Sequence, residues 1–174
     1  LNFLKNNGYK IEHIFNLLDQ AVLNGNLKLL DWIKNNDYEI KCISSWIDNV
    51  SYHGYVHVLD WFKNNCHKIR YKYAIFDASY HGHIHILDWF KNNGYELKYV
   101  NDAIYGAASQ GHIHILDWFK NNGFDINQYM CGIYMNFNVW NINVLNWFKN
   151  NNYKFIFVEY IIDNVLKYGD INVL

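Results

Sequence analysis

The sequence predicts an all-α fold, a solenoid of helical hairpins that repeats about every 29 residues. The thirteen residues GHIHILDWFKNNG occur at 82–94 and again, unchanged, at 111–123. A Leu followed two residues later by an aromatic residue also recurs, at successive spacings of 29, 29, 28, 29 and 29. The pairs are Leu1/Phe3, Leu30/Trp32, Leu59/Trp61, Leu87/Trp89, Leu116/Trp118 and Leu145/Trp147. We therefore expect residues 1–174 to form a single array of about five full units, with partial units at both ends.

The best-defined stretch of each unit predicts its second helix. In residues 112–122 the apolar side chains Ile115, Leu116 and Phe119 lie at i, i+1 and i+4, which is helical spacing. The run ends in Asn-Asn-Gly, where Gly123 can adopt the left-handed conformation that follows a helix end. We expect one helix of about eleven residues here.

The stretch before it predicts the first helix. Ile104, Ala107 and Ala108 repeat the i, i+3, i+4 spacing, and Gly111 lies where a tight turn between two helices needs positive φ. Small residues on this stripe allow first helices to pack closely, while bulky side chains fill the space beneath the second helices. The residues expected to be structural are Trp32, Trp61, Trp89, Trp118, Trp147, Gly54, Gly82 and Gly111.

The fifth unit departs from this pattern. Met135, Asn136 and Phe137 replace the small residues, and Trp140 replaces the turn glycine. A bulky residue at positive φ is strained, so we expect a remodelled turn and a first helix that ends early, near Asn136 or Asn138.

The two ends of the chain predict that it is an excerpt of a longer array. Leu1 is the Leu of a second helix, and Leu174 follows Gly169 by only five residues. A free-standing solenoid needs polar terminal caps, and neither end has one.

Residues 107–127, AASQGHIHILDWFKNNGFDIN, resemble the ankyrin repeat. The family's alanine pair, Gly-His turn and closing Gly-x-Asp-Val-Asn match Ala107/Ala108, Gly111/His112 and residues 123–127. Its Thr-Pro-Leu-His opening is not kept at residues 102–105, and the unit is about four residues short of 33. The resemblance implies an ankyrin-like stack whose β-hairpin fingers are shortened or missing. Short units rich in Trp and Asn are similar to those of giant DNA viruses of amoebae, which implies an intracellular protein, in the cytoplasm of a host cell.

Composition and motifs argue against several function classes. Fifteen Lys and Arg against sixteen Asp and Glu, scattered along the chain, give no footprint for nucleic acid. No apolar run is long enough to cross a membrane. We find no catalytic or cofactor motif and expect no enzyme and no cofactor. The cysteines Cys42, Cys66 and Cys131 fit no metal or disulfide pattern, so we expect ordinary thiols in a reducing compartment.

Two periodic features invite sharper interpretations that we do not favour. Alternate histidines in HGHIH suggest a metal site, but residues i and i+2 of a helix point apart, and neighbouring helices lie about 8–10 Å from each other. We expect no metal, with His83 and His112 serving the turn and the other histidines facing solvent. Asp and Lys three residues apart on each second helix predict a solvated charged face. These residues are Asp31, Asp60, Asp88, Asp117, Lys34, Lys63, Lys91 and Lys120.

The first helices vary between units where the second helices repeat, which predicts a recognition surface on the first helices. Their outward residues line the concave side in ankyrin-type stacks, and two successive Tyr-His pairs are typical of binding hot spots. The expected partner-binding residues are Asn49, Tyr52, His53, Asp77, Tyr80, His81, Ser109 and Gln110. We expect a non-catalytic scaffold that binds another protein. Neutral drift of exposed sites, an architectural spacer, and an adaptor that recruits host ubiquitin machinery through a domain outside these residues remain open.

Overall fold

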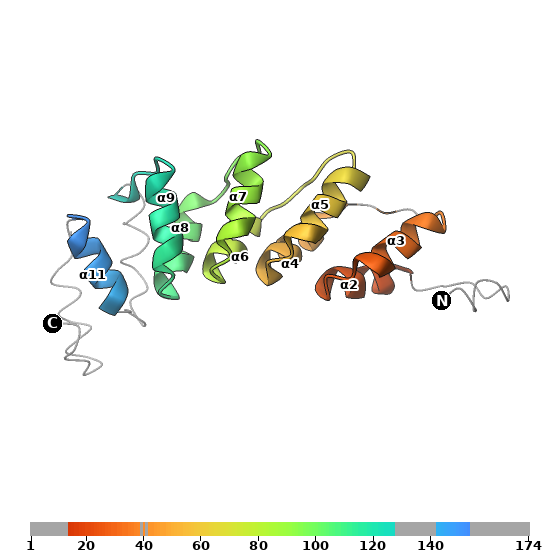
Figure 1. Cartoon of the computed structure of the whole chain (residues 1–174), viewed down its shortest axis with the longest axis horizontal. Helices are drawn as coiled ribbons and strands as arrows, with labels where there is room; N and C mark the ends of the chain where they lie inside the picture. The colour runs from red at the N-terminus through yellow and green to blue at the C-terminus, as the bar shows by residue number, and fades with distance from the viewer. Residues whose placement is uncertain (1–13, 39, 41, 128–141, 154–174) are drawn as a thin grey trace.

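The computed structural model describes residues 14–38, 40, 42–127 and 142–153, and every regular element within them is an α-helix (Figure 1). The helices are α2 (Ile14–Leu23), α3 (Leu27–Asn35), α4 (Ser44–His53), α5 (Val56–Asn65), α6 (Ala74–Tyr80), α7 (Ile84–Asn92), α8 (Val100–Ser109), α9 (Ile113–Asn121) and α11 (Ile142–Asn150). The predicted all-helical repeat is confirmed for these residues. The predictions for the turn at Trp140 and for the ends of the chain fall outside them.

The helices pair into hairpins that are stacked in one row along the long axis of the molecule (Figure 1). The even-numbered helices are the first helices of their units, and α4 and α6 each pack against the first helices on either side. The odd-numbered helices are the second helices, and each of α3, α7 and α9 packs against the first helix of its own unit, as does α5. The turns between paired helices lie at one edge of the row, and the loops that leave the second helices lie at the other (Figure 1).

In the four hairpins from α2 to α9, a glycine at positive φ forms the tight turn between the paired helices. Gly54, Gly82 and Gly111 have φ of 74°, 75° and 76°. The space beside Gly54 and Gly82 is also occupied, because a Cβ added to Gly82 would lie 3.1 Å from the ring of His112 in the next unit. These two positions therefore need glycine both for the turn and for the close approach of the following hairpin.

An asparagine and a left-handed residue end most of the second helices. The amide of Asn93 donates to the carbonyl of Trp89 at 2.7 Å, and the next residue, Gly94, has φ of 72°. The same bond recurs at Asn36, Asn65, Asn122 and Asn151. Only α5, among the described second helices, is followed by an extended residue, Cys66, whose φ is −117°.

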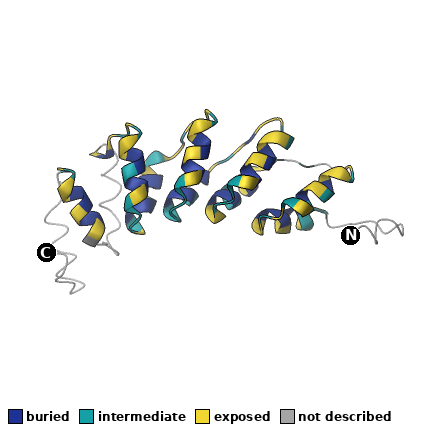
Figure 2. Cartoon of the chain, viewed as in Figure 1, coloured by how far each residue is buried: buried dark blue, intermediate teal, exposed yellow. Residues whose placement is uncertain are grey.

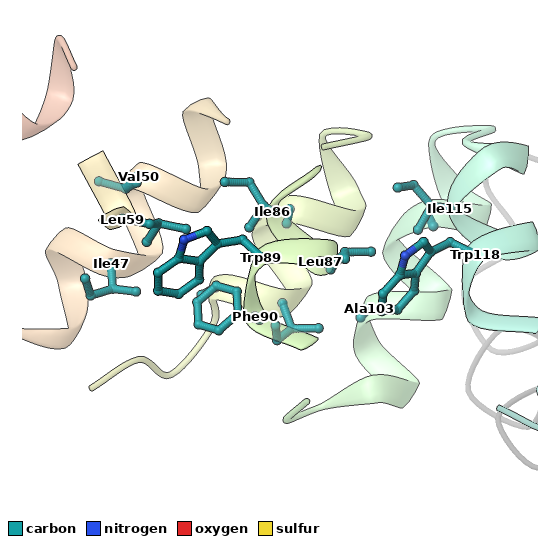
Figure 3. Packing of buried hydrophobic residues seen from close by; sticks show 14 of the residues in the cluster. Ile47, Val50, Leu59, Ile86, Leu87, Trp89, Phe90, Ala103, Ile115 and Trp118 are labelled. Atoms are coloured by element: carbon teal, nitrogen blue, oxygen red, sulfur yellow. The ribbon is translucent and has the colours of Figure 1, made fainter. Parts of the chain in front are cut away.

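The core runs the length of the array between the two sets of helices (Figure 2). In Figure 3 the rings of Trp89 and Trp118 extend from α7 and α9 toward the preceding unit. Both indoles are only 6 % exposed, and Phe90 and Phe119 are fully buried beside them. Trp61 and Trp147 are buried in the same way, whereas Trp32 is half-buried. Each unit thus completes its core against its neighbour, as a solenoid requires.

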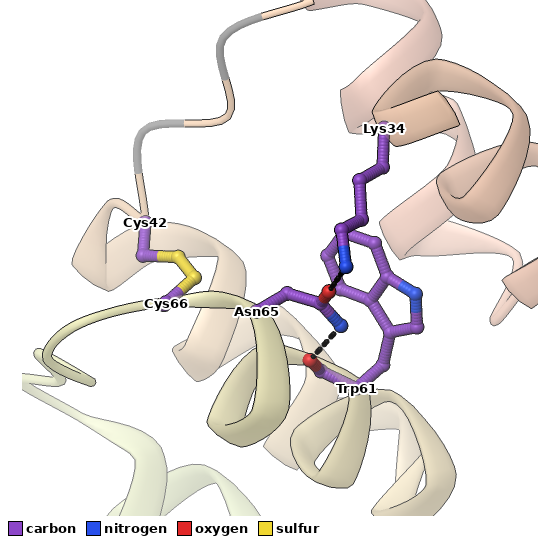
Figure 4. The surroundings of a disulfide bond; sticks show 5 residues. All are labelled: Lys34, Cys42, Trp61, Asn65 and Cys66. Atoms are coloured by element: carbon purple, nitrogen blue, oxygen red, sulfur yellow. Dashed lines mark hydrogen bonds between the residues drawn. A yellow bond between two sulfur atoms is a disulfide. The ribbon is translucent and has the colours of Figure 1, made fainter. Parts of the chain in front are cut away.

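A disulfide links Cys42 to Cys66, so the expectation of ordinary thiols is wrong for these two residues (Figure 4). Their Cα atoms are 6.2 Å apart, although 24 positions separate them in the sequence. The bond ties the segment that enters α4 to the segment that leaves α5. The hairpin brings the two cysteines together, and spacing alone did not show this. Cys131 lies outside the described residues.

No helix among the described residues combines the length and the apolar character needed to cross a bilayer.

Candidate functional site

The last turns of α4 and α6 carry four aromatic side chains in mutual contact. The Tyr52 ring lies 3.9 Å from the His81 ring and 4.8 Å from the His53 ring, between centroids. The Tyr80 ring lies 5.0 Å from His81. These four residues, here called the ring cluster, join two neighbouring units at the turn edge of the array. Tyr52 remains 45 % exposed, so the cluster presents an aromatic surface to solvent.

Histidines of the following units hold the backbone of the ring cluster in place. His83 Nε2 lies 2.9 Å from the carbonyl oxygen of Tyr52, and His112 Nε2 lies 3.0 Å from that of Tyr80. A carbonyl oxygen only accepts hydrogen bonds, so Nε2 is the protonated nitrogen in both imidazoles. Each tyrosine is therefore fixed at its main chain by the next hairpin, which limits the entropy it loses on binding.

Three histidines at or beside the ring cluster are disfavoured as cations. Burial lowers the pKa of His81, and the neighbouring His112 and His53 lower it further. Burial also lowers the pKa of His83 and of His112, more than their hydrogen bonds to carbonyl oxygens raise it. The imidazoles of His81, His83 and His112 are thus mostly neutral near pH 7.

Asp77 is the acidic residue that sequence analysis assigned to this surface. It lies half-buried on α6, where burial and the nearby Asp48 raise the pKa of its carboxyl to about 6. Asp48 itself accepts hydrogen bonds from the main-chain N–H groups of Lys72 and Tyr73, at 3.0 and 2.9 Å. Asp77 is therefore partly protonated under mildly acidic conditions.

The remaining residues predicted to bind a partner are less exposed or lie outside the ring contacts. Asn49 is half-buried on α4, and the Ser109 hydroxyl donates to the carbonyl oxygen of Gly106 at 2.8 Å, within its own helix. Gln110 is exposed at the end of α8. Tyr80 is half-buried, with its ring 5.6 Å from that of Phe76. Of the eight residues, ring contacts thus bring together Tyr52, His53, Tyr80 and His81.

The aspartates of the second helices, expected to form only a solvated charged face, also bind the indoles of neighbouring units; we call Asp31, Asp60, Asp88 and Asp117 the Asp column. The indole Nε1–H of Trp89 donates to the carboxylate of Asp60, and that of Trp118 to Asp88, at 2.7 and 2.6 Å. The same bond joins Trp61 to Asp31 and Trp147 to Asp117. Each carboxylate therefore binds the indole of the following unit. The signal in the sequence was that Asp and Trp repeat with the same period.

The Lys column also bonds between units. The ammonium groups of Lys34, Lys63, Lys91 and Lys120 donate to Asn65, Asn93, Asn122 and Asn151. Figure 4 shows that Asn65 receives this bond while its own amide donates to the Trp61 carbonyl. Asn65, Asn93, Asn122 and Asn151, each the second asparagine of its Asn-Asn pair, thus end a helix and bind the preceding unit.

The histidines expected to face solvent have partners as well. His57, His85 and His114 are exposed, but their Nε2 atoms bond the carbonyl oxygens of Gly25, Gly54 and Gly82 at 3.1, 3.0 and 2.9 Å. The three histidines are exposed, as expected, but the register of the stack also brings each imidazole to the preceding turn, and these bonds were not predicted.

Among the described residues, no three His, Cys, Asp or Glu side chains are grouped as a metal ion would need. The surface formed by the ring cluster offers aromatic faces and imidazole rings, which suit contact with another macromolecule. Comparison with models of protein families and with curated proteins finds no match to this chain.

Proposed function

We propose that this chain is a non-catalytic scaffold that binds a protein partner through the ring cluster on an ankyrin-like array. The observation that carries the proposal is the contact of Tyr52 with His81, which joins two units while Tyr52 stays 45 % exposed. A monomeric protein gains little by holding a large aromatic ring at its surface, whereas tyrosines of this kind dominate many binding interfaces.

The ankyrin-like type of the array is part of the proposal. It is supported by paired helices, by turn glycines at positive φ, and by the closely packed first helices with alanines at their contact. The side of the stack that carries the ring cluster would then be its concave face.

The direct test is capture of partners from host-cell cytosol on immobilised protein, followed by mass spectrometry and by titration of each partner in isolation. We expect Tyr52→Ala to weaken binding of a true partner at least tenfold, the effect of a hot-spot residue. Its melting temperature should change little, because an exposed substitution usually costs less than about 0.5 kcal/mol.

Phe15→Ala is the matched control, because Phe15 is also an exposed aromatic residue, at 56 %, and lies on α2 away from the ring cluster. It should leave the partner's affinity unchanged. Equal loss of binding in both variants, or none in Tyr52→Ala, would refute the assignment of the site.

An architectural spacer is the second candidate, and the bonds between units favour it. Trp, His and Lys side chains of successive units are used to join the stack, as the repeated bonds to Asp, Gly and Asn show. A spacer would bring no partner whose binding depends on Tyr52. A spacer is instead expected to be stiff along the array, and the array should become less stiff when Asp60→Ala removes the bond that the Trp89 indole donates to Asp60.

We also propose that the protein acts inside a host cell. The resemblance to the repeats of giant DNA viruses of amoebae supports this proposal, whereas the Cys42–Cys66 disulfide counts against a cytosolic location, because such bonds persist in oxidising compartments and are rare in the cytosol. Alkylation of free thiols at the moment of cell lysis, followed by mass spectrometry, measures the fraction of the bond formed in the cell. A fully oxidised pair would contradict a cytosolic location.

A further inference from the structure

We propose that the two loops that follow α5 and α7 form a second binding surface, for an acidic segment of a protein. The surface consists of Lys68, Arg70, Lys72, Tyr73, Lys98 and Tyr99, here called the basic loop patch. It lies at the edge opposite the turns, where the loops leave the second helices (Figure 1). It is therefore separate from the ring cluster.

Charge is concentrated in this patch. Four of the fifteen Lys and Arg residues of the chain, including its single Arg, lie in the patch, and all four are exposed. Glu96 is the one acidic residue within the same two loops. On the described second helices, Lys34, Lys63, Lys91 and Lys120 bond to Asn of the next unit. The patch cations are thus a local excess in a chain whose formal net charge is −1.

The tyrosines of the patch lie among these cations. Tyr73 and Tyr99 are 47 % and 48 % exposed, and their ring centroids are 6.0 Å apart. The ammonium of Lys72 lies 4.6 Å from the centre of the Tyr73 ring, and that of Lys98 lies 5.0 Å from the Tyr71 ring. These contacts restrain the lysine side chains while the ammonium groups stay in solvent, so less entropy is lost when they meet carboxylates.

The first loop is anchored along its length. The disulfide at Cys66 fixes its start, and Ile69, 6 % exposed, is buried in its middle. At its end the carboxylate of Asp48 holds the N–H groups of Lys72 and Tyr73. The anchored loop therefore presents Lys68, Arg70 and Lys72 in a fixed arrangement.

The second loop is tied to the first and is strained at the patch. The Tyr71 hydroxyl donates to the main-chain oxygen of Glu96, which joins the loops. Tyr99 has φ of 54° and ψ of 41°, a left-handed conformation that bulky residues seldom adopt. That conformation occurs where the exposed Tyr99 ring meets Tyr73, which adds to the case for a binding role.

The arrangement favours an acidic peptide over nucleic acid. The Tyr73 and Tyr99 rings are in contact and inclined by 36°, so no base fits between them. The positive charge of these four residues is also confined to the patch, whereas a nucleic-acid strand needs a row of positive charges that continues along its backbone. Carboxylates of a short acidic segment need only the spacing that the two loops provide, and Arg70 can bind one of them through two hydrogen bonds.

The probe is a fluorescein-labelled peptide of ten residues in which Glu and Gly alternate, titrated with the intact chain by fluorescence anisotropy. We expect saturable binding at low ionic strength that weakens as salt is added. Arg70→Gln combined with Lys98→Gln should weaken it about fivefold. The matched control combines Lys28→Gln with Lys149→Gln, which removes the same charge from exposed residues of α3 and α11 and should leave the affinity unchanged.

Three results would overturn the proposal: no binding by the unsubstituted chain, equal weakening in both double variants, or tighter binding of a ten-nucleotide single-stranded DNA than of the peptide. Circular dichroism of each variant shows that it is folded. Tyr52→Ala is measured alongside and should leave peptide binding unchanged. The basic loop patch is thus tested independently of the ring cluster, so a failure of one binding site is distinguished from a failure of the other.

Discussion

At the residue scale, the repeated segment GHIHILDWFKNNG has a role for nearly every side chain. In residues 82–94 the glycine makes the turn and the two histidines bond the preceding unit. The apolar residues fill the core, Asp88 accepts from the next indole, and Lys91 donates to the next asparagine. A segment in which most positions face a neighbouring unit has few positions free to vary, which accounts for its unchanged recurrence.

Ser79 differs from these side chains in its hydrogen bonding. Its hydroxyl is buried and has no hydrogen-bond partner among the described residues, whereas the Ser51 hydroxyl, one unit earlier, donates to the Ile47 carbonyl at 2.8 Å. Ala108 occupies the same place one unit later. We expect Ser79→Ala to raise the free energy of unfolding by about 1 kcal/mol, because it removes an unsatisfied polar group.

Urea denaturation of the Ser79→Ala variant measures this change. Ser51→Ala is the control and should be neutral or destabilising, since its hydroxyl is already bonded. A loss of stability in Ser79→Ala would show that the hydroxyl has a partner.

At the element scale, the helices were the part that sequence could predict. The helix expected at 112–122 is α9, Ile113–Asn121, because apolar periodicity and the Asn-Asn-Gly end are local signals. The bonds of Asp88, His85 and Lys91 were not predictable in the same way, because their partners lie about 30 positions away and depend on the register of the stack. For the ring cluster, sequence indicated the outward face of the first helices but not which residues meet.

The Trp column allows burial and hydrogen bonding to be separated. Trp118→Ala should cost about 3–5 kcal/mol, because it leaves a cavity between two units. Trp118→Phe keeps an aromatic ring and loses the N–H bonded to Asp88, so its cost should be smaller, about 1–3 kcal/mol. Chemical denaturation followed by circular dichroism measures both. Equal losses would mean that the hydrogen bond, and not the buried area, dominates.

At the scale of the whole molecule, stability should depend on pH through the histidines at the turn edge. The pKa values of His81, His83 and His112 are lowered in the folded chain, so the unfolded chain binds more protons as pH falls below about 6.5. The stability that these groups contribute is present above that pH and is lost as pH falls through their folded pKa values.

Two carboxyls oppose this trend. The pKa of Asp77 is raised to about 6 and that of Asp48 is also raised, so both favour the folded chain as they are protonated. We expect the urea midpoint to decrease as the pH is lowered from 7.5 to 5.5. The decrease should be steeper in Asp77→Asn, because this variant has lost one of the two opposing carboxyls. A midpoint that rises toward pH 5.5 would show that the carboxyls dominate.

The disulfide should contribute to stability across its hairpin. A bond that closes 24 positions of chain typically stabilises a fold by about 2–4 kcal/mol. Thermal melting with and without a reducing agent should therefore show a lower midpoint after reduction. The double variant Cys42→Ser with Cys66→Ser should melt at the reduced value and should not respond to the reductant, which excludes an effect through Cys131.

The bonds between units give the array a direction. Each of the three hairpins that end in α5, α7 and α9 donates indole and imidazole N–H groups to the hairpin before it and an ammonium group to the hairpin after it. Each of these hairpins therefore has one face that fits the hairpin before it and another that fits the hairpin after it. Helices α7 and α9, which pack against each other, have the same sequence. A second copy of residues 83–111 inserted after Gly111 should lengthen the chain by one complete hairpin. Its second helix would repeat the α7–α9 contact, and the new contact would be that of α8 with its own copy. The length of this protein can therefore change while the bonds between its second helices stay the same.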